Sequence, residues 1–118
     1  ECYLDMLEDE LNSVDAVLNH IEKVEIKEGI FDEHVIQKDL IRAYFDLELA
    51  LASLCILLRK MSENLFIHID EDIRRDINSI IHSNKFEYHD HDRIYVYSQK
   101  GKEPVDLNNL LRFARSIL

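Results

Sequence analysis

Glycine and proline together account for only three of the 118 residues: Gly29, Gly101 and Pro104. A chain of this length with average composition carries roughly 14 such residues. An all-β sandwich or barrel needs a turn about every ten residues, and glycine and proline supply many of those turns. Their scarcity argues against an all-β fold and predicts long helices.

The length predicts one domain, residues 1–118, with a single hydrophobic core. Hydrophobic residues make up 47% of the chain and charged residues 32%, which is typical of a folded protein and not of a disordered one. Because the sequence begins with Glu1 and not with methionine, we expect a trimmed chain or a piece of a longer protein.

The negative charge lies in the first part of the chain. The 14 basic and 24 acidic residues give a net charge of −10, and residues 1–50 hold 4 of the basic and 14 of the acidic ones. Residues 51–118 hold the other 10 of each. Nucleic-acid binding depends on cations that displace counterions from phosphates. Any nucleic-acid site is therefore expected after residue 50, and the acidic part is expected to face elsewhere, for example towards a basic protein partner.

The cysteines and the longest apolar stretch predict a protein of the cytoplasm. Cys2 and Cys55 lack the spacing of a metal or redox site, and we expect no disulfide, as in a reducing compartment. The longest apolar stretch, residues 47–58, contains Glu48 and is too short to cross a bilayer. With no recognisable signal peptide, we expect a cytoplasmic protein that does not bind membranes.

Two long helices are predicted in the first part of the chain. In residues 3–27, apolar side chains recur every three or four positions, which indicates an amphipathic helix. These positions are Leu4, Leu7, Leu11, Val14, Leu18 and Ile21. Gly29 is expected to end this helix, and a second one to cover about residues 33–61. Its stretch LELALASLCILL is apolar nearly all round, so it packs against several helices or faces a second copy of the chain.

The rest of the chain predicts a third helix and an extended segment. Residues 62–69 are compatible with a connector, a strand or extra helix. Asp70 is suited to cap a helix that ends near residues 82–84. Apolar residues then alternate at Phe86 and Tyr88 and again over residues 94–97, which predicts two short strands around residues 89–92.

The end of the chain predicts one more helix. Residues 99–102 contain Gly101 and are expected to form a turn, and Pro104 marks a break after it. Asp106 is suited to cap the last helix. The predicted fold is thus mostly α: a bundle of four to five helices with a short β-hairpin-like segment before the last one.

The predicted helix near residues 70–84 has two different faces. With Arg75 at zero and about 100° per residue, His82 falls at about −20°, Ser79 at about 40° and Asn78 at about −60°. Four isoleucines fall on the opposite side, between about 140° and 240°: Ile73, Ile77, Ile80 and Ile81. The isoleucines are expected to hold the helix on the core and leave the polar group exposed. Arg74, at the edge of this group, either widens a basic strip or pairs with Glu71 or Asn78.

An arginine and a histidine two turns apart on one face suit phosphate chemistry. The guanidinium of Arg75 is always charged and can fork onto phosphate oxygens. The imidazole of His82 can accept and donate protons near neutral pH. Together they can cleave RNA without a metal, with Asn78, Ser79 and Arg74 binding the substrate. Solvated helices also carry Arg and His at this spacing without any function, so the spacing alone leaves both interpretations open.

Arg75, the polar residue Asp76 after it and His82 resemble the R-x(4–6)-H motif of HEPN domains, with six intervening residues. Two long helices precede the motif helix RRDINSIIHSN, and the extended segment KFEYHDHDRIYVYSQKGKEPV and the helix DLNNLLRFARSIL follow it. This order resembles the small HEPN proteins of bacterial toxin–antitoxin and anti-phage systems, and the likeness covers most of the chain.

The resemblance implies an all-helical bundle, a homodimer in which the two motif helices meet, and a metal-independent endoribonuclease without cofactors. Arg75 and His82 would be catalytic, and an antitoxin or other protein would be a partner. Many active members carry Asn where this chain has Asp76, whose charge would weaken phosphate binding or pair with Arg74. Several HEPN proteins are catalytically inactive, so the alternative is a module that binds RNA, a nucleotide or a protein.

Two further groups carry alternatives. The sequence HDHD at residues 89–92 offers two imidazoles and two carboxylates to a metal, but a polar hairpin tip is the expected interpretation. Tyr88, Tyr95 and Tyr97, interleaved with Lys85 and Arg93, would stack on bases or pack against a helix, and packing is the favoured prediction. The sequence contains no glycine-rich phosphate loop, nucleophile elbow or HExxH motif.

Overall fold

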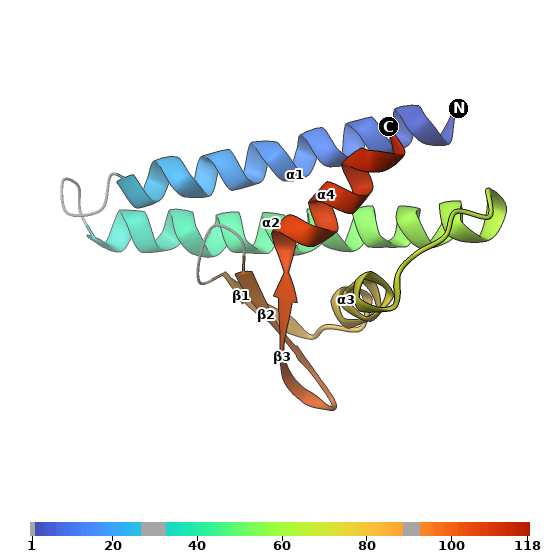
Figure 1. Ribbon diagram of the computed structural model, residues 1–118. Helices are drawn as coiled ribbons and strands as arrows, with labels where there is room; N and C mark the ends of the chain where they lie inside the picture. The colour runs from blue at the N-terminus through green and yellow to red at the C-terminus, as the bar shows by residue number, and fades with distance from the viewer. Residues whose placement is uncertain (1, 27–32, 89–92) are drawn as a thin grey trace.

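The computed structural model describes residues 2–26, 33–88 and 93–118, without the side chains of residues 26 and 33–36. In this part of the chain, four helices and three strands follow one another in the order α1, α2, α3, β1, β2, β3, α4. The fold is mostly helical, as predicted. Helices α1 (Tyr3–Ile26) and α2 (Glu33–Asn64) form a long antiparallel pair (Figure 1). The helix end expected at Gly29 lies outside the described residues.

Helices α1 and α2 supply much of the hydrophobic core. Four of the six apolar positions predicted in α1 are buried: Leu7, Leu11, Val14 and Ile21. The side of α2 that faces the core buries a matching series: Ala43, Leu47, Leu51, Leu54, Leu58 and Met61. The spacing of three and four residues puts each series on one side of its helix, which is why the two helices pack together. In the described residues, no helix is long and apolar enough to cross a membrane.

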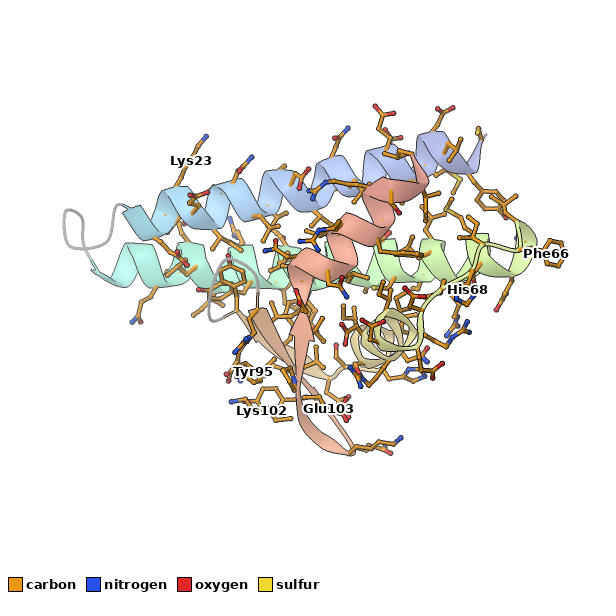
Figure 2. The ribbon with its side chains drawn as sticks, viewed as in Figure 1. Lys23, Phe66, His68, Tyr95, Lys102 and Glu103 are labelled. Atoms are coloured by element: carbon orange, nitrogen blue, oxygen red, sulfur yellow. The ribbon has the colours of Figure 1, made fainter. Side chains whose placement is uncertain are left out.

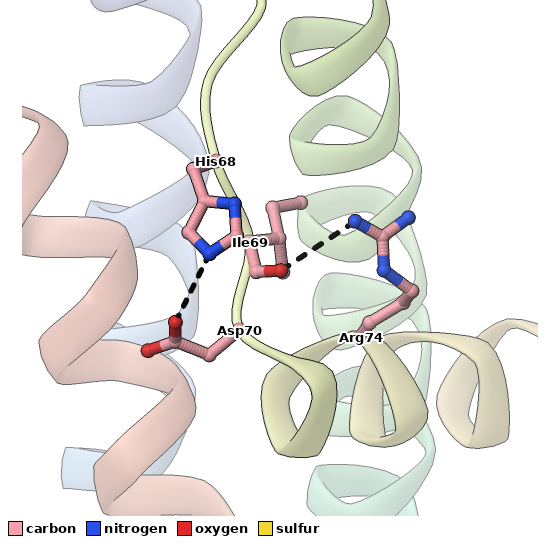
Figure 3. Close-up of polar contacts among 4 residues, drawn as sticks. All are labelled: His68, Ile69, Asp70 and Arg74. Carbon is pink, nitrogen blue, oxygen red and sulfur yellow. Dashed lines mark hydrogen bonds and ion pairs between the residues drawn. The ribbon is translucent and has the colours of Figure 1, made fainter.

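Helix α2 continues three residues beyond its predicted end, and residues 65–70 follow as a connector without regular secondary structure. This outcome decides between the interpretations of residues 62–69: they form the last turn of α2 and a connector. Helix α3 (Glu71–Ile81) then begins after Asp70, the predicted N-cap residue. The Asp70 side chain makes no capping hydrogen bond; its carboxylate lies 3.3 Å from Nε2 of His68 (Figure 3).

Three strands follow α3, one more than predicted. Strands β1 (Lys85–Tyr88), β2 (Arg93–Ser98) and β3 (Gly101–Asp106) form an antiparallel sheet in that order. The additional strand lies where a turn and a break were expected. The turn shortens to residues 99–100, and Gly101 begins β3 at a φ of 114°, which suits a residue without a side chain. Pro104 is tolerated because β3 is an edge strand, where one side carries no ladder hydrogen bonds.

Helix α4 (Leu107–Ile117) closes the fold and crosses the α1–α2 pair (Figure 1). Asp106 caps it as predicted, because its Oδ1 accepts a hydrogen bond from the backbone N–H of Asn109 at 3.0 Å. Its apolar side is buried: Leu107, Leu110, Leu111 and Ala114. The inner face of the sheet joins the same core through Phe86, Ile94, Val96 and Val105. Helix α3 and the sheet lie together on the side of α2 away from α1 (Figure 1).

Candidate functional site

Helix α3 has the orientation that its isoleucines predict. Ile73, Ile77 and Ile80 are buried, and Ile81 is half-buried. Opposite them, four of the five predicted site residues are exposed: Arg74, Arg75, Asn78 and His82. The fifth, Ser79, is half-buried. The helix therefore presents one polar face. The five predicted site residues on this face make different contacts.

Arg75 borders a polar pocket of about 490 Å³ between α3, the sheet and the start of α4. We call it the Arg75 pocket. Its charged lining consists of two arginines and three aspartates: Arg75, Arg93, Asp72, Asp76 and Asp106. Tyr95 and Asn109 also line it, and the Asn109 amide donates a hydrogen bond to Asp72 at 3.2 Å. The pocket combines residues from four elements, so no single stretch of sequence reveals it.

Asp76 is the residue of this pocket whose environment the sequence did not reveal. Its side chain is only 6% exposed, and burial raises the pKa of its carboxyl from 3.8 to about 6. The positive charge of Arg75 and a hydrogen bond from the backbone of Asp106 act in the opposite direction. The expected pairing with Arg74 is not the contact that the structure gives; its neighbours are Arg75 and Asp106. The available signal was its position about 100° from Arg75, between the polar and the apolar side of the helix.

His82 lies at the other end of the polar face. It is the C-cap residue of α3, and its ring Nδ1 lies 2.9 Å from the backbone oxygen of Asn78. It lies seven positions after Arg75, which corresponds to about 10 Å along the helix axis. His82 does not line the Arg75 pocket. Within one chain, the two predicted catalytic residues share a face of α3 but not a pocket.

The three predicted substrate-binding residues have separate environments. The Ser79 hydroxyl donates a hydrogen bond to Glu103 of β3 at 3.1 Å, so this residue ties α3 to the sheet. Arg74 points back to the connector, where its guanidinium lies 3.5 Å from the backbone oxygen of Ile69 (Figure 3). The Asn78 side chain is exposed, and its backbone oxygen faces the ring of His82.

The outer face of the sheet, opposite the core, carries two tyrosines for which the sequence analysis favoured packing against a helix. Tyr95 and Tyr97 lie on it, next to Lys102, and Figure 2 shows Tyr95 and Lys102 on the same side of the sheet. The prediction that the strand tyrosines pack against a helix holds for Tyr88, whose ring centroid lies 6.0 Å from that of Tyr44 in α2. Tyr95 and Tyr97 instead project from the other side of β2, because residues 95 and 97 alternate with the buried residues of this strand. Tyr95 lines the Arg75 pocket beside residues of α3 and α4.

Helix α2 exposes an apolar stripe on the side away from the core. Its members are Ile41, Phe45, Leu49 and Ile56, of which Ile41 is 68% and Phe45 61% exposed. Next to β1, this stripe borders a second pocket of about 430 Å³. Burial there raises the pKa of Glu48. Within a single chain, α2 packs against α1 on one side and against α3 and β1 on another, as one of the two alternatives predicted, and it leaves this stripe exposed.

The HDHD sequence considered as a metal site lies outside the described residues. Among the described residues, no group of three or more His, Cys, Asp or Glu side chains is placed to hold a metal ion. Cys55 is buried and Cys2 is exposed, and neither forms a disulfide.

No family model matches the chain, and no curated protein and no solved structure matches it significantly. The likeness to HEPN domains therefore rests on the motif residues and on the order of the elements described above.

Proposed function

We propose that the protein is a metal-independent endoribonuclease of a toxin–antitoxin or anti-phage type, with Arg75 and His82 as its catalytic residues. The observation that carries the proposal is that both side chains are exposed on one face of α3, while Ile73, Ile77 and Ile80 hold the opposite face in the core. The chain thus presents a permanent cation and a titratable base together, on a rigid element.

The chemistry needs only these two groups and the RNA itself. The imidazole of His82 accepts the proton of a ribose 2′-hydroxyl as its oxygen attacks the adjacent phosphorus. The bond between phosphorus and the 5′-oxygen breaks, and that oxygen takes up a proton from the imidazolium that His82 has become. Arg75 stabilises the charge on the phosphate oxygens. The products are a 2′,3′-cyclic phosphate and a 5′-hydroxyl end, and no metal takes part.

Two copies of the chain would bring the catalytic residues closer together than one copy does. Arg75 and His82 lie at equal distances along the helix axis from the midpoint between Asn78 and Ser79. If a two-fold axis passes through this midpoint and the two helices run antiparallel, each Arg75 lies opposite the partner's His82. A homodimer of this kind agrees with the resemblance to HEPN domains. The acidic first part of the chain would then remain for an antitoxin or another basic partner.

The cleavage test uses purified protein with mixed RNA in excess EDTA. We expect cleavage with 2′,3′-cyclic phosphate ends, and a loss of about 10²- to 10⁴-fold in rate for Arg75→Ala and His82→Ala. Arg112→Ala and His20→Ala are matched controls, because both side chains are exposed on other helices. Cleavage by the Arg75→Ala and His82→Ala variants at the parent rate would refute the site.

The dimer test separates the two exposed surfaces. A second copy on α3 predicts that Asn78→Glu lowers the mass measured by light scattering from two chains to one. Phe45→Glu, which alters the apolar stripe of α2, is then expected to leave the mass unchanged. Dissociation by Phe45→Glu alone would put the second copy on α2, and a monomeric parent would contradict the homodimer.

The second candidate function is a catalytically inactive module that binds RNA, a nucleotide or a protein. The Arg75 pocket favours it, because Asp72, Asp76 and Asp106 surround the guanidinium with carboxylates that compete with a phosphate. The contact between Ser79 and Glu103 adds a further carboxylate beside α3. Tight RNA binding without any cleavage, in the absence and presence of divalent ions, would support this function over the ribonuclease.

A further inference from the structure

We propose that the outer face of the three-stranded sheet binds single-stranded nucleic acid, with bases stacked on Tyr95 and Tyr97. The ligand is RNA if the proposed function holds, and the inference rests on that function only for this choice. The site differs from the pair Arg75 and His82, and it depends on other side chains.

The alternation of β2 decides which side chains reach this face. Ile94 and Val96 are buried in the core, so Tyr95 and Tyr97 project from the opposite side of the strand. Both tyrosines are half-buried and thus offer part of their ring surface to a ligand. Because two residues of a strand span about 6.6 Å, the rings are spaced for successive bases of an extended strand.

Lysines flank the rings on both neighbouring strands. The register pairs Tyr97 with Lys85 on β1 and with Lys102 on β3. The ammonium of Lys102 lies 4.6 Å from the ring centroid of Tyr95 and 5.7 Å from that of Tyr97. The ammonium of Lys85 lies 5.9 Å from the centroid of Tyr97. Alternating aromatic rings and cations suit single strands, because every base has a stacking face and every nucleotide a phosphate.

Binding requires the lysines to move from the rings to the phosphates. A lysine side chain has four flexible methylene groups, so its ammonium can exchange a ring face for a phosphate oxygen while a base takes the ring. Glu87 limits this movement for Lys102, because its carboxylate lies 3.9 Å from that ammonium. The same residue accepts a hydrogen bond from the Tyr97 hydroxyl at 3.0 Å, which fixes the orientation of the ring.

The charge of the face favours an anionic ligand although the whole chain is acidic. Among the described residues, the cations of this face are Lys85, Arg93 and Lys102, and its carboxylates are Glu87 and Asp106, which is the register partner of Arg93. The face thus carries one more positive than negative charge, in a chain with a net charge of −10. Arg93 and Tyr95 also line the pocket that contains Arg75. A nucleic-acid strand bound on the sheet can therefore continue to α3, where the proposed cleavage takes place.

The test measures binding by fluorescence anisotropy with a labelled 12-nucleotide RNA that carries 2′-O-methyl groups. This probe lacks the attacking hydroxyl, so binding is measured without cleavage. We expect about tenfold weaker binding for Tyr95→Ala and for Tyr97→Ala. The conservative variants Tyr95→Phe and Tyr97→Phe are expected to bind within about threefold of the parent, because a phenyl ring still stacks. Lys60→Ala, a change on α2 far from the sheet in sequence, is the control for charge.

Parent affinity in Tyr95→Ala and Tyr97→Ala would overturn the proposal, as would no binding by the parent or equal binding of a duplex. A thermal unfolding curve for each variant shows whether it is folded. Binding that depends on the tyrosines, in a protein that cuts no unmodified RNA, would support the sheet site and reject the ribonuclease. Cleavage of unmodified RNA, with binding that does not depend on the tyrosines, would support the ribonuclease and reject the sheet site.

Discussion

The α1–α2 pair and the C-terminal region, which consists of α3, the sheet and α4, differ in what holds them and in what they expose. The pair packs through aliphatic side chains and exposes acidic residues and the apolar stripe of α2. The C-terminal region consists of short elements, and these carry the Arg75 pocket and the tyrosines of the sheet. The difference indicates that the long helices serve as a scaffold, while the short elements bring residues with distinct chemistry together.

The largest expected effect is in the scaffold. Leu54 of α2 is fully buried, and Leu54→Ala is expected to lower the free energy of unfolding by about 2–5 kcal/mol, because it removes packed methyl groups and leaves a cavity. Ile56, two residues away, is 43% exposed and is the matched control, with an expected loss of under about 1 kcal/mol for Ile56→Ala. Urea unfolding checks both. Equal losses would mean that the outer stripe of α2 is covered in solution, for example by a second copy.

The next effect is a pH dependence that arises in the C-terminal region. The pKa of Asp76 is about 6 in the folded chain and 3.8 as the ordinary value, so the folded state binds more protons between these two pH values. The free energy of unfolding of the protein therefore falls as the pH rises from about 4 to about 6. Asp76→Asn removes this loss, and we expect the variant to be more stable than the parent at pH 7 by on the order of 2 kcal/mol.

Urea unfolding between pH 4 and pH 7 checks this prediction. Near pH 4 the variant and the parent are expected to have similar stability, because the carboxyl is then largely protonated. Asp39→Asn is the matched control, since Asp39 is exposed on α2 and does not line this pocket. A less stable Asp76→Asn variant at pH 7 would mean that the attraction between Asp76 and Arg75 outweighs the cost of burial.

The smallest expected effect is the loss of an N-cap residue, and the C-terminal region offers two such residues for comparison. Asp106 makes a capping hydrogen bond to the backbone of Asn109, so Asp106→Ala is expected to cost about 1 kcal/mol of unfolding free energy. Asp70 occupies the same position before α3 but makes no such bond, and Asp70→Ala is expected to cost under about 0.5 kcal/mol. Thermal unfolding of the two variants measures the difference. A larger loss for Asp70→Ala would show that its contact with His68 matters more than a cap.

The helices could be predicted because their signals are local. The spacing of apolar residues predicted α1 and α2 to within a few residues, and the isoleucines of α3 predicted which side of this helix faces the core. Strands β1 and β2 followed from alternation. Strand β3 was missed because Gly101 and Pro104 are turn residues in most contexts, and only the edge position of the strand makes both acceptable.

The candidate site was predictable only in part, because it combines several elements. The exposure of Arg75 and His82 follows from the helical period, but their different surroundings do not. The burial of Asp76 and the link from Ser79 to Glu103 depend on how β3 and α4 meet α3. The position of Tyr95 and Tyr97 on the outer face could have been predicted from the sequence. These tyrosines alternate along β2 with Ile94 and Val96, the aliphatic residues that face the core.

The most direct test of the account is an NMR titration of the ¹⁵N-labelled protein with the 2′-O-methyl RNA. The account predicts that amide signals shift for residues on the polar face of α3 and on strands β2 and β3, while those of α1 and α2 stay in place. Shifts confined to the α1–α2 pair, or no shifts at saturating RNA, would contradict the claim that the C-terminal region carries the function.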